Sequence, residues 1–113
     1  MAGRSFDDEI PQGTLDMLVL KTLASEGDRH GFQIAQAIEQ ASGDILRVEE
    51  GSLYPALQRM LVKGWIVGEW GRTDENRRAR YYRLTAAGRR QLDREVESYT
   101  RVAGAIARVL QVV

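Results

Sequence analysis

A cluster of arginines follows the middle of the chain, in a segment that also holds residues typical of turns. The arginines are Arg72, Arg77, Arg78 and Arg80, and the turn formers among them are Gly71, Asp74 and Asn76. A guanidinium group binds phosphate through paired N–H donors, so the cluster indicates contact with a nucleic-acid backbone or insertion into a narrow minor groove. A solubilising hairpin tip is the alternative, and Asp74 and Glu75 reduce the local positive charge.

A short amphipathic helix is predicted before the cluster. Apolar residues recur from Leu53 to Leu61 at spacings of three and four, which gives one buried stripe. We expect Ser52 to cap this helix, Pro55 to lie in its first turn and Gly64 to end it. The exposed residues at its start carry groups suited to phosphates and base edges. They are Ser52, Tyr54, Pro55, Gln58 and Arg59. Packing against the neighbouring hairpin is a second interpretation for Tyr54.

Two strand-like runs enclose the arginine cluster, at residues 65–70 and 80–84, and the polar residues 71–79 between them predict a hairpin with a long tip. A helix followed by a basic hairpin is the layout of a winged helix-turn-helix domain. The second helix of that motif enters the major groove of DNA. We therefore predict a mainly α fold with a small β-hairpin wing, in which residues 11–85 form the domain and residues 31–41 and 52–63 form the motif.

The charges are unevenly distributed, although they sum to zero. Residues 1–51 carry four basic and ten acidic side chains, residues 52–90 carry nine basic and three acidic ones, and residues 91–113 carry three of each. The middle segment, at +6, coincides with the predicted helix and hairpin. A local field attracts a polyanion more than the total charge does, so the distribution favours nucleic acid. Taken alone, it is equally compatible with a solvated basic face.

A long helix is predicted over residues 86–113, with Thr85 as its capping residue. From Ala86 to about Gln111 it would be roughly 39 Å long. Its apolar residues form a heptad-like seam. They are Leu92, Val96, Tyr99, Val102, Ala103, Ile106, Val109 and Leu110. A domain of this size cannot cover the whole seam, so we expect the helix to dimerise with a second copy; packing within the chain and fraying is the alternative.

The segments before the motif complete the predicted domain. Residues 1–10 are polar and acidic, and we expect a loose arm. A first helix would start at Thr14 and end at Gly27, and a second would run from Gly31 to Gly43. Their apolar residues are Leu15, Leu18, Val19 and Leu23 (with Thr22 beside them) in the first, and Phe32, Ile34, Ala35, Ile38 and Ala41 in the second. Residues 45–48 would form an edge strand or a loop.

Composition argues against catalysis and against a bound metal. The chain has no cysteine and a single histidine, His30, so neither a thiolate site nor a nucleophile–base pair can be built readily. We expect His30 to support the first turn of the second helix, and we expect no cofactor. No apolar run approaches the ~18 residues of a membrane span, and the N-terminus lacks the pattern of a secretion signal, so we expect a cytoplasmic protein.

Four stretches of the chain resemble the PadR family of bacterial transcriptional regulators. They are PQGTLDMLVLKTLA, HGFQIAQAIE, EEGSLYPALQRMLVKGWI and RRARYYRLTAAGRRQL. The similarity covers about residues 11–95, and the segments from Gly51 to Leu57 and from Tyr81 to Gly88 are its specific parts. Because one helix follows the wing, the chain resembles the short subgroup of this family.

The resemblance implies a homodimeric repressor of the winged-helix type that binds imperfect inverted repeats in promoters, with its third helix in the major groove and its wing on the flanking backbone. The first helix, with Leu15, Leu18 and Val19, would cross the last helix of the partner. Some short members bind planar aromatic molecules through a tryptophan on the last helix. Here Tyr99 is the only aromatic residue of that helix, so the resemblance does not identify an effector.

Two other functions fit parts of the pattern. A winged helix can hold a protein partner without touching DNA, and such a module would tolerate the loss of Arg77 and Arg78. A carrier of small molecules would need an open apolar pocket at the dimer interface, lined by Leu92, Val96 and Tyr99. The main prediction remains a dimeric regulator that binds a pseudo-palindromic operator and is released by an effector.

Overall fold

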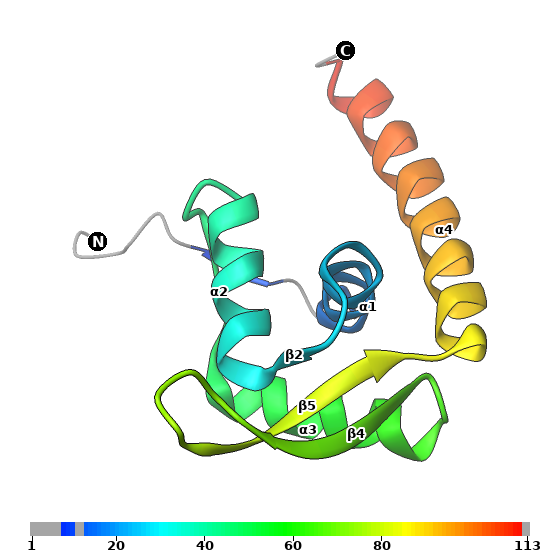
Figure 1. Ribbon diagram of the computed structural model, residues 1–113. Coiled ribbons are helices and arrows are strands. Elements are labelled where there is room, and N and C mark those ends of the chain that lie inside the picture. Colours follow the sequence, from blue (N-terminus) through cyan, green and yellow to red (C-terminus); the bar gives the residue numbers. More distant parts are fainter. Residues whose placement is uncertain (1–7, 11–12, 112–113) are drawn as a thin grey trace.

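The computed structural model describes residues 8–10 and 13–111 (Figure 1). Helix α1 (Leu15–Glu26) lies at the centre of the domain, between α2 (Gly31–Ala41) and α4 (Ala86–Leu110). Helix α3 (Glu50–Val62) packs on α1 below them, next to the hairpin. The mainly helical fold with a β wing is therefore as predicted.

The wing belongs to an antiparallel sheet with the strand order β2 (Arg29–His30), β5 (Arg78–Leu84), β4 (Ile66–Arg72). The pairing of β4 with β5 runs from Ile66 opposite Leu84 to Arg72 opposite Arg78, so only residues 73–77 form the turn. Our prediction of a loop over residues 71–79 was therefore too long. Asn76 adopts a φ of 63°, and Thr73 N donates to Arg77 O at 2.8 Å, which lets the strands continue to this short turn.

The N-terminal segment lies only partly within the described residues. Of the predicted loose arm, residues 1–7 lie outside them. Asp8–Glu9, which we also expected in the arm, instead form strand β1 and pair in parallel with β3 (Leu46–Arg47). Ile10 then packs against the core. The extended link predicted at residues 45–48 contains β3, as expected.

The core draws on every large element. It consists of Met17, Val19, Leu20, Leu23, Ile34, Ile38, Leu53, Ala56, Leu57, Met60, Ile66, Tyr82 and Leu92. Thr22 is also buried, and its hydroxyl donates to the carbonyl of Leu18 at 2.8 Å. The prediction for the apolar stripe of α2 is wrong at two positions. Phe32 points away from the Ile34–Ile38 face and is 67% exposed, and Ala41 is exposed at the end of the helix.

Helix α3 begins earlier than predicted. Glu49 is its N-cap, and its carbonyl accepts from the N–H groups of Ser52 and Leu53 at 3.0 and 2.9 Å. Ser52 therefore lies inside the first turn and does not cap the helix. Pro55 lies in the second turn, so its missing N–H leaves the carbonyl of Gly51 without a helical donor. Gly51 is exposed, so water can satisfy that carbonyl.

Helix α4 is anchored at its start and open at its end. As predicted, Thr85 caps it, because Gly88 N donates to Thr85 Oγ1 at 3.0 Å. The Thr85 hydroxyl also lies 2.6 Å from the carbonyl of Gly64, so it joins the helix to the turn after α3. The first half of α4 packs beside α1, whereas its second half extends away from the domain (Figure 1).

Candidate nucleic-acid interface

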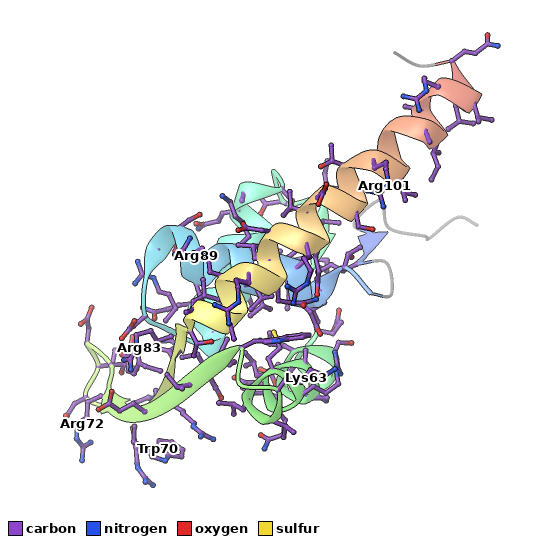
Figure 2. All side chains as sticks on the ribbon, turned by 90° about the vertical axis from the view of Figure 1, so that its right-hand side faces the viewer. Lys63, Trp70, Arg72, Arg83, Arg89 and Arg101 are labelled. Carbon is purple, nitrogen blue, oxygen red and sulfur yellow. The ribbon has the colours of Figure 1, made fainter. Side chains whose placement is uncertain are left out.

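The two elements predicted to contact DNA lie at one end of the molecule. Both views place α3 and the hairpin together at the end opposite the C-terminal half of α4 (Figures 1 and 2). Figure 2 shows Trp70 and Arg72 of the wing and Lys63 at the end of α3 along this edge, with Arg101 of α4 far from it. The basic residues of α3 and of the tip of the hairpin are thus gathered on one side, whereas Arg89 lies on the first turns of α4.

The predicted contact residues of α3 are all exposed, and they divide between an outer line and two flanks. The predicted set is Ser52, Tyr54, Pro55, Gln58 and Arg59. Buried residues at positions 53, 56, 57 and 60 define the inner face of the helix. With 100° between successive residues, Pro55 and Gln58 lie opposite that face, whereas Tyr54 and Arg59 lie on the two sides of the helix.

The flanking residues of α3 are held by neighbouring helices. Nη2 of Arg59 forms an ion pair with Oδ1 of Asp16 in α1 at 2.9 Å, which draws this guanidinium toward the domain. Tyr54 lies against the start of α2, since a Cβ at Gly31 would be 2.6 Å from its hydroxyl oxygen. A larger residue at position 31 would therefore have to displace the ring of Tyr54. The tyrosine remains 46% exposed, so this contact with α2, which is not the packing against the hairpin that the sequence suggested, leaves part of its ring accessible.

Three of the four predicted arginines of the wing share the exposed tip. Arg72, Arg77 and Arg78 are exposed, and Nη1 of Arg72 donates to the carbonyl of Asn76 at 3.2 Å. The guanidinium of Arg78 lies 4.1 Å from the centre of the Trp70 ring. This cation–π contact restrains the guanidinium and leaves its edge free for hydrogen bonds. Trp70, which is 57% exposed, was not among the predicted site residues, although its place in the predicted strand next to the arginines was a signal.

Arg80 differs from the other three. It lies within β5 opposite Trp70, as the predicted strand over residues 80–84 implied, and it is half-buried on the face of the hairpin that covers the domain, so it is less available to DNA than the exposed arginines of the tip. A Cβ at Gly68 would overlap its Nε, so that glycine makes room for the side chain. The Nε is buried and finds no hydrogen-bond partner among the described residues. Burial raises the pKa of Tyr82 next to it, and the charge of Arg80 opposes this shift.

The remaining charged and titratable residues near the wing have ordinary structural roles. Arg83 is exposed and lies 3.7 Å from Asp28 and 3.9 Å from Glu69, so it is a surface charge with acidic neighbours. His30 is the N-cap of α2, as expected, and its N–H donates to Gln33 Oε1 at 3.1 Å. Within residues 8–10 and 13–111, no cluster of histidine, aspartate and glutamate could hold a metal ion.

The predicted dimer residues fall into three groups. Val19 and Leu92 are 0% and 5% exposed in the core of the chain itself, so they leave almost no surface for a partner and that part of the prediction is wrong. Leu15, Leu18 and Ala103 are half-buried. The others are exposed along α4 and are Val96, Tyr99, Val102, Ile106, Val109 and Leu110.

Among the described residues, no helix combines the length and the apolar character that crossing a bilayer requires.

Comparisons with known proteins agree with this geometry. The model of the PadR-like family of transcriptional regulators matches residues 19–94. Protein X of Lysinibacillus sphaericus is 31% identical over 94 residues, which cover 83% of this chain and 85% of that protein. A 37.1 kDa protein encoded in a transposon of Streptomyces fradiae is 43% identical over 90 residues, which cover 80% of this chain and 24% of that protein.

Solved structures give the same answer for the fold. A transcriptional regulator from Clostridium thermocellum superposes with a TM-score of 0.77 at 27% identity, over 86% of this chain and 93% of that one. A PadR-like transcriptional regulator from Bacillus cereus superposes with a TM-score of 0.74 at 26% identity, over 88% and 94% of the two chains. The chain belongs to the PadR-like family of DNA-binding transcriptional regulators.

Proposed function

We propose that this regulator is a homodimeric repressor that binds a pseudo-palindromic operator and is released by an effector. The observation that carries the proposal is the exposed apolar stripe of α4, at the end of the molecule opposite α3 and the wing. Val96, Tyr99 and Ile106 are 42%, 54% and 54% exposed at heptad-like spacings. Such a stripe is stable in water only when a second apolar surface covers it, and a copy of the same helix supplies one.

Dimerisation through α4 would present two recognition helices to DNA. In each subunit α3 would enter the major groove, with Ser52, Tyr54, Pro55 and Gln58 toward it. Arg72, Arg77 and Arg78 would contact the phosphates beside the groove. Two half-sites about 34–36 Å apart, on one side of the duplex, would then match the two-fold symmetry of the protein. Such a dimer would act in the cytoplasm and would repress by occupying a promoter.

An effector would act by favouring a dimer whose two α3 helices have the wrong separation. A surface depression of about 470 Å³ between α1 and α4 is lined by apolar residues, among them Leu18, Val96 and Tyr99, and by the charged residues Lys21, Asp93 and Glu97, which supports a site for a mainly apolar molecule near the dimer contact. The last helix has no tryptophan, so the aromatic stacking implied by the family resemblance has only Tyr99 to use. We expect an effector to bind through apolar contact there.

The test is fluorescence anisotropy with labelled DNA from upstream of the protein's own gene and with a shuffled control, at two salt concentrations. Tight binding to the native fragment that survives the higher salt supports the proposal. Equal and salt-sensitive binding to both fragments indicates a basic surface without specificity. Absence of binding to either at low salt contradicts it and favours a protein-interaction module. A reporter gene behind the same promoter then distinguishes repression, which lowers its expression, from activation.

A further inference from the structure

The outermost line of α3 carries no charge. Gly51, Pro55, Gln58 and Val62 follow one another at spacings of four, three and four, so they share the face opposite the buried stripe. Val62, which was not among the predicted site residues, is 80% exposed. A surface depression of about 400 Å³ runs along the line; Pro55, Gln58 and Val62 form its floor, and the side chains of Arg59 and Lys63 border it with mainly apolar atoms. A ligand at the centre of this face would therefore contact apolar groups and the side-chain amide of Gln58.

The cations next to this line are directed to its sides. Arg59 is paired with Asp16 at 2.9 Å, and the ammonium of Lys63 lies 5.1 Å from the centre of the Trp65 ring. Arginine and lysine are the side chains that recognise guanine through its O6 and N7 atoms. With both held on the flanks, the outer line keeps only Gln58 as a hydrogen-bonding side chain. These flanking cations suit phosphates on the two sides of a groove.

We propose that α3 selects A·T base pairs, with Gln58 recognising adenine and Pro55 and Val62 contacting thymine methyl groups. The amide of glutamine pairs with N6 and N7 of adenine, and apolar side chains contact the C5-methyl of thymine in the major groove. Val62 follows Pro55 by seven positions, so the two lie roughly 10 Å apart along the helix axis, about three base-pair steps of B-DNA. This inference rests on the proposed function, because it requires α3 to enter the major groove.

The experiment begins with selection of bound duplexes from randomised DNA by the full-length protein, followed by titration of single changes in the selected site. For the wild type, replacing the contacted adenine by guanine should weaken binding about 5- to 150-fold. Replacing the neighbouring thymines by uracil removes only the C5-methyl group, and should weaken binding about 4-fold for each methyl. Gln58→Ala should no longer distinguish adenine from guanine at the contacted position. Val62→Ala should no longer distinguish thymine from uracil at one position in each half-site.

The matched control is Lys63→Ala, which should weaken binding to all sites alike and leave both preferences intact. The uracil substitution alters only the DNA, so it tests the inference even if a variant folds poorly. The inference is overturned if the contacted pairs of the selected half-site are all G·C. It is also overturned if neither the uracil substitution nor Gln58→Ala changes the base preference. Either result leaves the proposed function standing. If no sequence is enriched and no duplex binds, both are wrong.

Discussion

The junction between the wing and α4 allows a sharp test of the packing. Gly88 lies in the first turn of α4 and is buried. A Cβ at this position would overlap the carbonyl oxygen of Trp65 and lie 2.8 Å from Cδ1 of Leu84. The same turn is capped by Thr85, whose hydroxyl lies 2.6 Å from the carbonyl oxygen of Gly64. Alanine at position 88 therefore has to displace either α4 or the turn after α3.

The expected change in the free energy of unfolding follows from three contributions. Replacing glycine by alanine inside a helix normally stabilises it by about 1 kcal/mol. Overpacking against a backbone carbonyl costs about 1–3 kcal/mol. Shifting the first turn weakens the Thr85 cap, which is worth about 1 kcal/mol. Gly88→Ala should therefore lower the free energy of unfolding by about 1–3 kcal/mol, opposite in sign to the usual effect of this substitution.

Gly104 provides the matched control in the same helix. A Cβ there would meet nothing closer than Nη1 of Arg108 at 3.9 Å, so Gly104→Ala should raise the free energy of unfolding by about 1 kcal/mol. Urea unfolding followed by circular dichroism measures both variants, at one fixed protein concentration because the stability of a dimer depends on concentration. If Gly88→Ala proves as stable as Gly104→Ala, the tight contact between α4 and Trp65 is refuted.

Three further outcomes test other parts of the molecule. Changing Tyr99 and Ile106 together to aspartate should convert the proposed dimer into monomers, because a charge cannot be buried without a partner; a mass of two chains in sedimentation equilibrium would contradict the α4 interface. Arg77→Ala should weaken binding to operator and shuffled DNA alike, and the slope of log Kobs against log salt should become shallower by about 0.9 for each phosphate that the variant no longer neutralises. An unchanged slope would exclude Arg77 from the interface. Asp16→Asn should change the free energy of unfolding by at most about 1 kcal/mol, since the ion pair is partly exposed. It should also free Arg59 and raise affinity for shuffled DNA, and a fall in that affinity would indicate instead that the pair positions α3.

The features that depend on neighbouring residues could be predicted from the sequence. Gly27 ends α1 with a φ of 82°, as its place after the apolar stripe predicted. Thr85 caps α4, and the spacing from Leu53 to Met60 correctly placed the buried face of α3. In each case the residue and its partner lie within one or two turns of the same element. Local periodicity and cap preferences are therefore sufficient there.

The features that depend on distant residues could not be predicted. Arg77 and Arg80 look equivalent in the sequence, yet Arg77 lies exposed in the turn, whereas the pairing of β4 with β5 places Arg80 half-buried opposite Trp70. The space for Arg80 comes from Gly68, twelve positions earlier on the other strand. Similarly, Arg59 appeared free to contact a base until its partner Asp16, 43 positions away, was located. Residue type sets what a side chain can bind, whereas the register of strands and helices decides whether it is available.

Helix α1 connects the two ends of the molecule that the proposed function requires to communicate. It contacts α4 on one side and α3 on another, and the Asp16–Arg59 ion pair ties it to α3. Packed helices shift as units because the interior has little free volume. In the proposed dimer, a change of angle between the two α4 helices would therefore move α1 and α3 with them. Since the two half-sites require a separation of about 34–36 Å, even a small rotation would take one α3 out of register. The depression between α1 and α4 is thus where an effector would have the greatest influence on DNA binding.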